Sequence, residues 1–306
     1  MDYSGLLNLQ IMIFMLMGIG VILKKIGIID DSGKKVVTDL VIYLFLPCNI
    51  INAFMIEFNK DILISGLTIL GISFVIQLMC TFISATCYKK IPKQQRMVLQ
   101  YGTVCSNAGF LGNPVAEGLY GPVGLLYASI YLIPQRIVMW SAGISYFTES
   151  PNKKEVLKRV LSHPCIIAVE IGIVIMLFQI PMPIFLDKTI NSIGGCATVT
   201  SMILIGTILA DVDMSTLVTQ LTVVYSFLRL LLIPLLVLVG CLLFQVDSLI
   251  TGLSVILASM PAGSTTAILA AKYEGDAEFA TKCVVLTTIL SMVMIPIWCM
   301  ILTWIG

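Results

Sequence analysis

The feature that most constrains this chain is a succession of long apolar stretches with little polar sequence between them. An α-helix needs about 20 apolar residues to cross a hydrocarbon core of about 30 Å. Ten stretches approach or exceed that length, namely residues 6–24, 36–56, 62–88, 97–118, 123–147, 160–180, 189–210, 217–246, 248–272 and 279–305. The pattern therefore predicts an all-α membrane protein with ten transmembrane helices.

The composition supports a chain that is exposed to lipid. Charged residues make up 11% of the sequence and apolar residues 58%, whereas soluble domains carry about 25% charged residues. The net charge is +1, and the basic residues cluster in short loops. They therefore form no basic face that could bind nucleic acid. The nine cysteines form no C-x-x-C pair and His163 is the only histidine, so we predict no metal site, no cofactor and no enzyme activity.

Basic residues predict the orientation of the helices. Most of them follow the odd-numbered stretches, at residues 24–35, 89–96, 149–159 and 272–282, whereas the even-numbered loops hold only Lys60 and Lys188. Since loops rich in Lys and Arg stay in the cytoplasm, both ends of the chain are expected outside a cell (inner or plasma) membrane. The first stretch lacks a small-residue cleavage site and is expected to stay as a transmembrane helix.

The ten stretches divide into two sets of five, residues 1–150 and 151–306, on either side of a basic loop. An odd number of helices per half means that two related halves would be inverted in the membrane. A weak internal match links the fourth and ninth stretches, because each places a break fourteen residues before a glycine, at Asn107–Gly121 and Pro261–Gly275. We therefore expect two inverted five-helix repeats.

Helix breakers interrupt the fourth and ninth stretches. They are Gly109, Gly112 and Pro114 in the fourth stretch and Pro261 and Gly263 in the ninth. Proline removes a backbone donor, and freed backbone groups cost several kcal/mol each in hydrocarbon unless something satisfies them. Paired interrupted helices typically mark a transporter's substrate site. The alternative is that these prolines only kink ordinary helices.

The chemistry around the breaks favours a negatively charged ligand. A half-helix that starts inside the membrane presents free amides and the positive end of its dipole. Asn49 and Asn52, next to Pro47 in the second stretch, could complete a polar pocket. The seventh stretch is its counterpart, and there Gly194 and Gly195 either expose backbone or allow close helix packing.

Ionisable residues inside apolar stretches are costly and are functional candidates. Arg136 would pair with a substrate carboxylate or form a structural bridge with Glu117 or Glu170, and Arg229 is expected to snorkel toward the cytoplasmic surface. Glu117 is the candidate for proton or cation coupling. The predicted substrate-binding residues are Asn49, Asn52, Asn107, Asn113, Pro114, Arg136, Pro261, Gly263, Ser264 and Thr265.

The same residues resemble a known family. Residues 105–114, CSNAGFLGNP, with Glu117 and Gly121 after them, are similar to the fourth-helix motif of the auxin efflux carrier family. Residues 46–49 and 260–276 resemble the second and ninth helices of that family, and the resemblance covers nearly the whole chain. Many bacterial members are expected to carry an apolar residue where Asn113 stands here.

The resemblance implies two inverted five-helix repeats, a scaffold part and a transport part, crossed broken helices at the substrate site, and elevator-like alternating access. Members include plant auxin exporters and bacterial permeases for malate or malonate, and this chain looks like the compact bacterial type. The expected function is therefore secondary transport of small organic anions. A cation-coupled symporter or antiporter of similar topology, a channel and a receptor remain alternatives.

The expected partners are a small organic anion and the lipid bilayer, with no nucleic acid. The substrate, the direction of transport, the coupling ion and the oligomeric state, with a homodimer among the options, are left open by the sequence.

Overall fold

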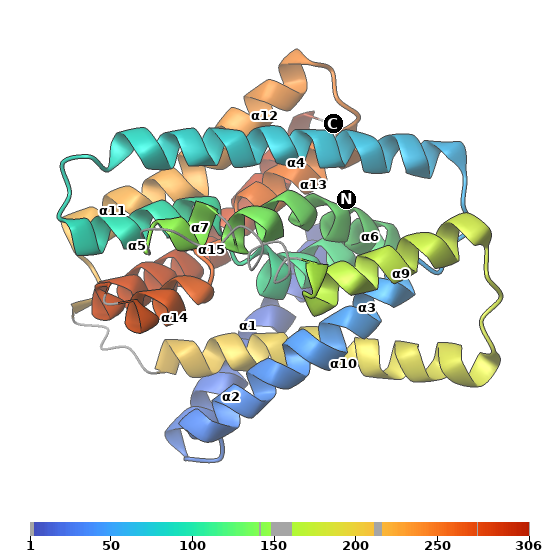
Figure 1. Ribbon diagram of the computed structural model, residues 1–306, viewed down its shortest axis with the longest axis horizontal. Coiled ribbons are helices and arrows are strands. Elements are labelled where there is room, and N and C mark those ends of the chain that lie inside the picture. Colours follow the sequence, from blue (N-terminus) through green and yellow to red (C-terminus); the bar gives the residue numbers. More distant parts are fainter. Residues whose placement is uncertain (1–2, 141, 148–160, 211–215, 274, 306) are drawn as a thin grey trace. The chain divides into compact units, whose positions relative to one another are not determined.

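A computed structural model describes residues 3–140, 142–147, 161–210, 216–273 and 275–305 of the chain (Figure 1). Within these ranges every regular element is helical and no β-strand occurs, so the all-α prediction is confirmed. Six helical segments there are long and apolar enough to cross a membrane. The basic loop at residues 149–159 lies outside the described residues.

The helical elements follow one another along the chain with short connections. They are α1 (Tyr3–Lys25), α2 (Asp31–Leu40), η1 (Val41–Phe45), α3 (Leu46–Ala53), α4 (Lys60–Cys87), α5 (Lys93–Val104), η2 (Ala108–Gly112), α6 (Asn113–Trp140), α7 (Ala142–Ser145), α9 (Pro164–Phe178), α10 (Ile184–Ala210), α11 (Gln220–Phe227), η4 (Leu228–Leu232), α12 (Ile233–Leu243), α13 (Ser248–Ala258), α14 (Thr265–Lys272) and α15 (Ala277–Ile305). Each of the ten predicted stretches overlaps helical residues, while the inverted repeats stay a prediction.

The chain forms two compact units, and each unit takes segments from both halves of the sequence. Unit 1 consists of Met1–Leu67, Asn113–Ile130 and Leu161–Asp211, and unit 2 consists of Thr68–Gly112, Tyr131–Val160 and Val212–Gly306. The predicted division at residue 150 describes sequence repeats, and the contacts group the helices differently. This grouping by contacts does not test the prediction of two related halves.

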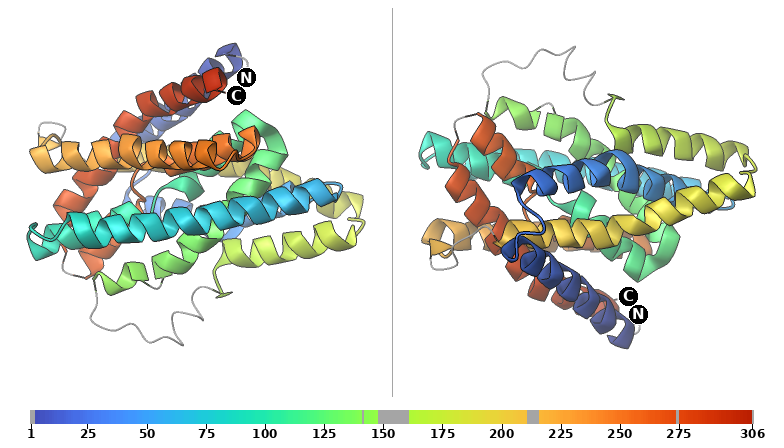
Figure 2. Two further views of the ribbon diagram at one scale, coloured as in Figure 1. Left: turned by 90° about the horizontal axis from the view of Figure 1, so that it is seen from above. Right: turned by 90° about the horizontal axis from the view of Figure 1, so that it is seen from below.

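Close backbone contact between α1 and α10 organises unit 1 (Figure 2). A Cβ atom added at Gly206 of α10 would overlap the carbonyl oxygen of Met17, and one added at Gly20 of α1 would overlap that of Ile203. Gly194 brings α10 equally close to α3, because its added Cβ would lie 2.9 Å from Cα of Asn49. For Gly194 the close-packing interpretation is therefore correct.

Three π-helical turns share one cause. The turns η1, η2 and η4 each end two residues before a proline, namely Pro47, Pro114 and Pro234. A proline has no N–H, and its ring clashes with the carbonyl four residues earlier, so a wider turn makes room for it. In η4 the orphaned carbonyl of Leu230 accepts a hydrogen bond from Nε1 of Trp298 (2.9 Å), which satisfies it inside the apolar core.

Helix α6 is in fact two helices that meet at Gly121. This glycine has φ 66° and ψ −157°, a conformation that side-chain-bearing residues rarely adopt. Pro122 follows and cannot donate a helical hydrogen bond. The break coincides with the gap predicted between the fourth and fifth apolar stretches.

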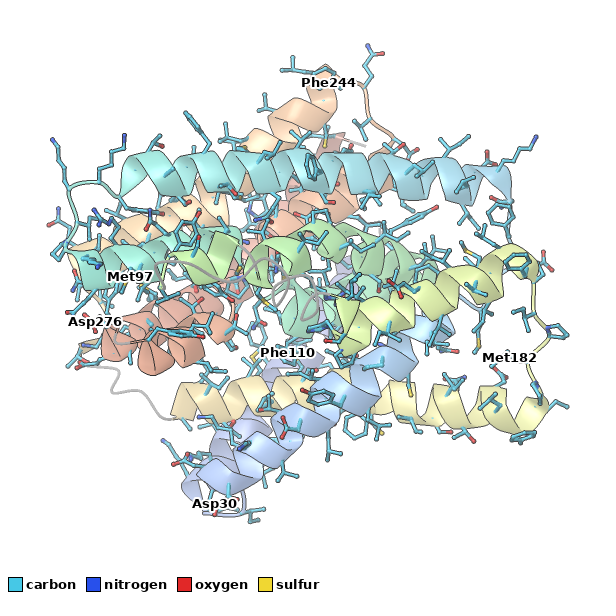
Figure 3. The ribbon with its side chains drawn as sticks, viewed as in Figure 1. Asp30, Met97, Phe110, Met182, Phe244 and Asp276 are labelled. Carbon is cyan, nitrogen blue, oxygen red and sulfur yellow. The ribbon has the colours of Figure 1, made fainter. Side chains whose placement is uncertain are left out.

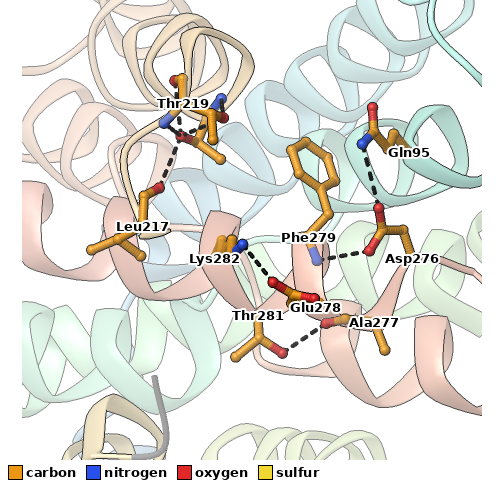
Figure 4. A network of polar contacts seen from close by, with 10 residues as sticks. Gln95, Leu217, Thr219, Asp276, Ala277, Glu278, Phe279, Thr281 and Lys282 are labelled. Carbon is orange, nitrogen blue, oxygen red and sulfur yellow. Dashed lines mark hydrogen bonds and ion pairs between the residues drawn. The ribbon is translucent and has the colours of Figure 1, made fainter. Parts of the chain in front are cut away.

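In unit 2 the starts of α5, α11 and α15 gather around a polar network (Figure 4). Asp276 caps α15 by accepting from the backbone N of Phe279 (2.9 Å), and Gln95 of α5 donates to its second carboxylate oxygen (3.3 Å). Lys282 and Glu278 form an ion pair on α15 (2.6 Å). Figure 3 labels Asp276 together with Met97 of α5 at this end of the unit. The cap by Asp276 fixes where α15 begins.

Candidate functional site

The candidate site lies where α5 and α13 end inside unit 2. Helix α5 ends at Val104, and Cys105 leaves it with φ −120° and ψ 98°. Helix α13 ends at Ala258, and α14 begins only at Thr265. Residues 105–107 and 259–264 are thus non-helical links between helices. The second link contains the predicted breakers Pro261 and Gly263, whereas Gly109, Gly112 and Pro114 lie in helical residues after the first link.

The two links pair with each other through their main chains. Ser106 and Ala262 form an isolated antiparallel bridge. The backbone N of Asn107 donates to the carbonyl oxygen of Pro261 (2.8 Å), and that of Gly263 donates to the carbonyl oxygen of Cys105 (3.0 Å). A helix resumes after each link, at Ala108 and at Thr265. Two helix starts are therefore held next to two helix ends.

Gly263 is needed for this close approach. A Cβ atom added there would lie 3.0 Å from the carbonyl oxygen of Cys105 and 3.3 Å from that of Ser106. A side chain there would be tight against both carbonyl groups. The structure thus gives Gly263, a predicted site residue, a role in bringing the main chains together.

Amide side chains from α4 and α6 donate to carbonyl groups at the end of α5 and in the first link. Nε2 of Gln77 in α4 donates to the carbonyl oxygen of Val104 (3.0 Å). Nε2 of Gln135 in α6 donates to that of Ser106 (2.8 Å), and its Oε1 accepts from the Ser106 hydroxyl (2.8 Å). On the other link, the backbone N of Ala262 donates to Oγ1 of Thr287 (3.2 Å). Such partners let non-helical backbone persist at membrane depth.

Arg229 bonds to the last turn of α5 and to the second link. It is 3% exposed, its Nε donates to the carbonyl oxygen of Met260 (2.9 Å), and its Nη1 donates to that of Thr103 (3.2 Å). The prediction that Arg229 snorkels to the surface is therefore wrong. Position along the helix suggested snorkelling, but the carbonyl groups at the helix ends give the guanidinium buried partners.

Polar groups near the helix starts remain available. Within the described ranges, Nδ2 of Asn107 and Oγ1 of Thr266 are buried and have no hydrogen-bond partner. Ser264 stands at the N-cap of α14 without making a side-chain capping bond, whereas Oγ1 of Thr265 accepts from the Tyr101 hydroxyl (3.2 Å). Buried unpaired donors cost about 1–3 kcal/mol each, so they point to a ligand or water that binds there.

Full-length similarity to known proteins now decides the family. The model of the membrane transport protein family matches residues 7–299. An uncharacterised transporter of Methanothermobacter thermautotrophicus is 26% identical over 99% of this chain and 100% of its own length. An uncharacterised transporter of Methanocaldococcus jannaschii is 24% identical over 95% of this chain and 97% of its own. The chain belongs to the membrane transport protein family.

The predicted resemblance to the auxin efflux carriers is thereby confirmed, and the protein is a multi-pass membrane transporter and not an enzyme. Both archaeal relatives are uncharacterised transporters, so the similarity alone does not identify a substrate. In the part of the chain that the structure describes, no three His, Cys, Asp or Glu side chains gather to hold a metal ion.

Five of the remaining predicted residues of the transporter lie in unit 1, namely Asn49, Asn52, Asn113, Pro114 and Glu117. Nδ2 of Asn49 in α3 donates to Oε2 of Glu117 in α6 (3.1 Å), which joins a predicted binding residue to the predicted coupling residue. Asn113 is buried, and neither its Oδ1 nor its Nδ2 has a partner among the described residues. Pro114 is the second residue of α6, and Asn52 is half-buried near the end of α3. A single pocket shared with the unit 2 residues stays a prediction.

Arg136 belongs to the second part of α6, in unit 2, and is 6% exposed. Glu170 is exposed on α9, and Glu117 bonds to Asn49. The two alternatives for Arg136, a substrate contact and a structural bridge, both stay predictions.

Sequence reasoning about this transporter missed Gln77 and Gln135 altogether. It weighed ionisable residues inside apolar stretches, whereas an uncharged amide in hydrocarbon is also costly without a partner. Each is a single amide in a long apolar stretch, and that signal could have drawn attention to them.

Proposed function

We propose that this transporter is a secondary carrier of small organic anions and that the paired links of unit 2 form part of its substrate site. The observation that carries the proposal is the main-chain pair between residues 105–107 and 261–263, which holds the helix starts at Ala108 and Thr265 together. The first amides of a helix favour an anion, and Asn107 and Ser264 add donors.

The wider mechanism is part of the proposal. The two links would be the breaks of the fourth and ninth of ten transmembrane helices, arranged as two inverted five-helix repeats in a cell membrane with both ends outside. Alternating access would follow an elevator-like movement of the unit that carries the links. The unpaired Asn107 amide and the uncapped start of α14 support a binding site at the links, and family membership supports transport.

Binding and counterflow together test the proposal. A thermal-shift screen of the purified protein against malate, malonate, lactate, citrate and aromatic acids should show stabilisation by at least one carboxylate. Proteoliposomes preloaded with that acid should then take up the labelled acid faster than empty ones. A channel shows no such trans-stimulation, so its absence would contradict a carrier mechanism.

Ser264→Ala and Asn113→Ala should each lower the rate of uptake about tenfold or more, because each removes a hydrogen-bonding group proposed to meet a charged substrate. Membrane insertion, measured as the yield of monodisperse protein, should stay normal. Ser192→Ala is the matched control, since Ser192 is exposed on α10 and bonds only to its own helix at Lys188. Full activity in both site variants would refute the site assignment.

We further propose Glu117 as the coupling residue, because Asn49 holds its carboxylate in α6 through the hydrogen bond described above. Glu117→Gln cannot exchange a proton or bind a cation by charge, so uptake by this variant should lose its dependence on pH or on sodium. Glu57→Gln, at an exposed position, is the control and should keep that dependence. Unchanged pH and sodium dependence in Glu117→Gln would rule out coupling at this residue.

A further inference from the structure

Arg229 is positively charged and lies inside unit 2, where it donates to two carbonyl oxygens and also contacts the thiol of Cys80. It is 3% exposed and donates to Met260 and Thr103, as described above. No Asp or Glu in the described part of the chain forms an ion pair with it. A buried cation normally needs a carboxylate or a comparable source of negative potential. The two carbonyl groups and the helices to which they are attached must therefore supply that negative potential.

The carbonyl group of Thr103 belongs to the negative end of α5, and that of Met260 lies just beyond the negative end of α13. Thr103 lies in the last turn of α5, and Met260 lies two residues beyond the last residue of α13. The C-terminal end of a helix carries about half an elementary negative charge, so two such ends match about one guanidinium. Arginine suits this task because its planar fork donates in two directions at once.

The pairing of Arg229 with the negative helix ends also affects the helix starts beside them. Only three residues separate Val104 from the start of η2 at Ala108, and six separate Ala258 from the start of α14 at Thr265. Without a cation, each negative helix end would cancel much of the positive potential of the helix start beside it. With Arg229 in place, the negative ends are neutralised and the positive starts are not.

We propose that Arg229 is a positioning residue for the anion site: by pairing with the carbonyl ends of α5 and α13 it neutralises them, so that the helix starts at Ala108 and Thr265 act on a carboxylate substrate. This inference rests on the proposed function and deepens it, since it names what sets the preference for anions. Arg229 acts through the backbone and needs no contact with the substrate.

A purely structural role for Arg229 makes a different prediction. If the guanidinium only tied the links together, its loss would lower stability and weaken the binding of all substrates alike. If its charge sets the potential, the loss must grow with the charge of the ligand. Malonate and malonamate, its monoamide, form a suitable pair of probes, because they have nearly the same shape and differ by one negative charge.

The experiment measures the affinity of the wild-type protein and its variants for both probes in detergent, and gel filtration checks that each variant is folded. Arg229→Gln should lose about tenfold in affinity per negative charge, hence about tenfold for malonamate and about 100-fold for malonate. Arg229→Lys keeps the charge and should keep the wild-type ratio of the two affinities. Gln77→Leu removes a hydrogen bond to the carbonyl group of Val104, at the end of α5, without changing the charge. This variant should also keep the wild-type ratio. Arg229→Met provides a second neutral variant should Arg229→Gln fail to fold.

The outcomes separate the two proposals. An unchanged affinity ratio in a folded neutral variant would overturn the role of Arg229 and leave the carrier proposal intact. A wild-type protein that binds neither probe nor any acid of the thermal-shift screen would overturn the carrier proposal, and this inference with it. A ratio that falls about tenfold in Arg229→Gln but not in Arg229→Lys or Gln77→Leu supports the inference.

Discussion

Asn107→Asp is expected to abolish uptake of organic anions at neutral pH. The substitution keeps the shape of the side chain but replaces a buried, unpaired amide donor beside the paired links with a carboxylate. A negative charge about 5 Å from the substrate, at an effective dielectric constant of about 20, costs about 3 kcal/mol, which is a loss of more than about 100-fold in affinity.

Uptake of the labelled acid into proteoliposomes measures this effect. Asn59→Asp is the control, because it makes the same chemical change at an exposed position. Asn59 accepts a hydrogen bond from the backbone N of Ile62 at the start of α4, and an Asp side chain can accept the same bond. That control should transport at the wild-type rate. Wild-type uptake by Asn107→Asp would show that no anion passes close to residue 107.

Gly206→Ala is expected to give the largest loss of stability. A single Cβ atom at this position would overlap the carbonyl oxygen of Met17 and lie 2.9 Å from Cα of Gly20, so α1 and α10 would have to separate. Backbone atoms cannot turn aside as side chains can, and we expect a cost of about 3 kcal/mol, the upper end of the range for overpacking. The melting temperature in detergent should fall, with less monodisperse protein recovered.

Gly195→Ala on the same helix provides the matched control. No atom lies within 4 Å of a Cβ added at Gly195, and alanine favours a helix over glycine by up to about 1 kcal/mol. The melting temperature of this variant should stay constant or rise. Equal melting temperatures for Gly206→Ala and Gly195→Ala would contradict the close contact between α1 and α10.

Much of the local structure could be predicted from the sequence, because local residue types cause it. Pro261 and Gly263 lie in the link at 259–264, and Gly121 breaks α6 in the gap between the fourth and fifth stretches. The link at 105–107, however, comes before the predicted breakers Gly109, Gly112 and Pro114, which are helical. Apolar stretches of membrane-spanning length likewise marked the helices. The pairing of the two links was an inference from the chemistry of broken helices, and the main-chain hydrogen bonds agree with it.

The partners of polar side chains could not be predicted, because they depend on contacts between distant segments. Arg229 reaches Thr103, 126 positions earlier in the chain, and no periodic pattern encodes that distance. The hydrogen bond from Asn49 to Glu117 spans 68 positions. The grouping of helices into two units that each mix both halves of the chain has the same origin.

The main-chain pair at Ser106 and Ala262 also bears on how the family diverges. A hydrogen bond between peptide groups is indifferent to which side chain is attached, provided that the donor is not proline and the approach stays clear. Lineages can therefore exchange the residues that flank the pair, and with them the cargo, while the frame persists. The two archaeal relatives share about a quarter of their residues with this chain, as expected for a family that keeps its backbone frame while its side chains change.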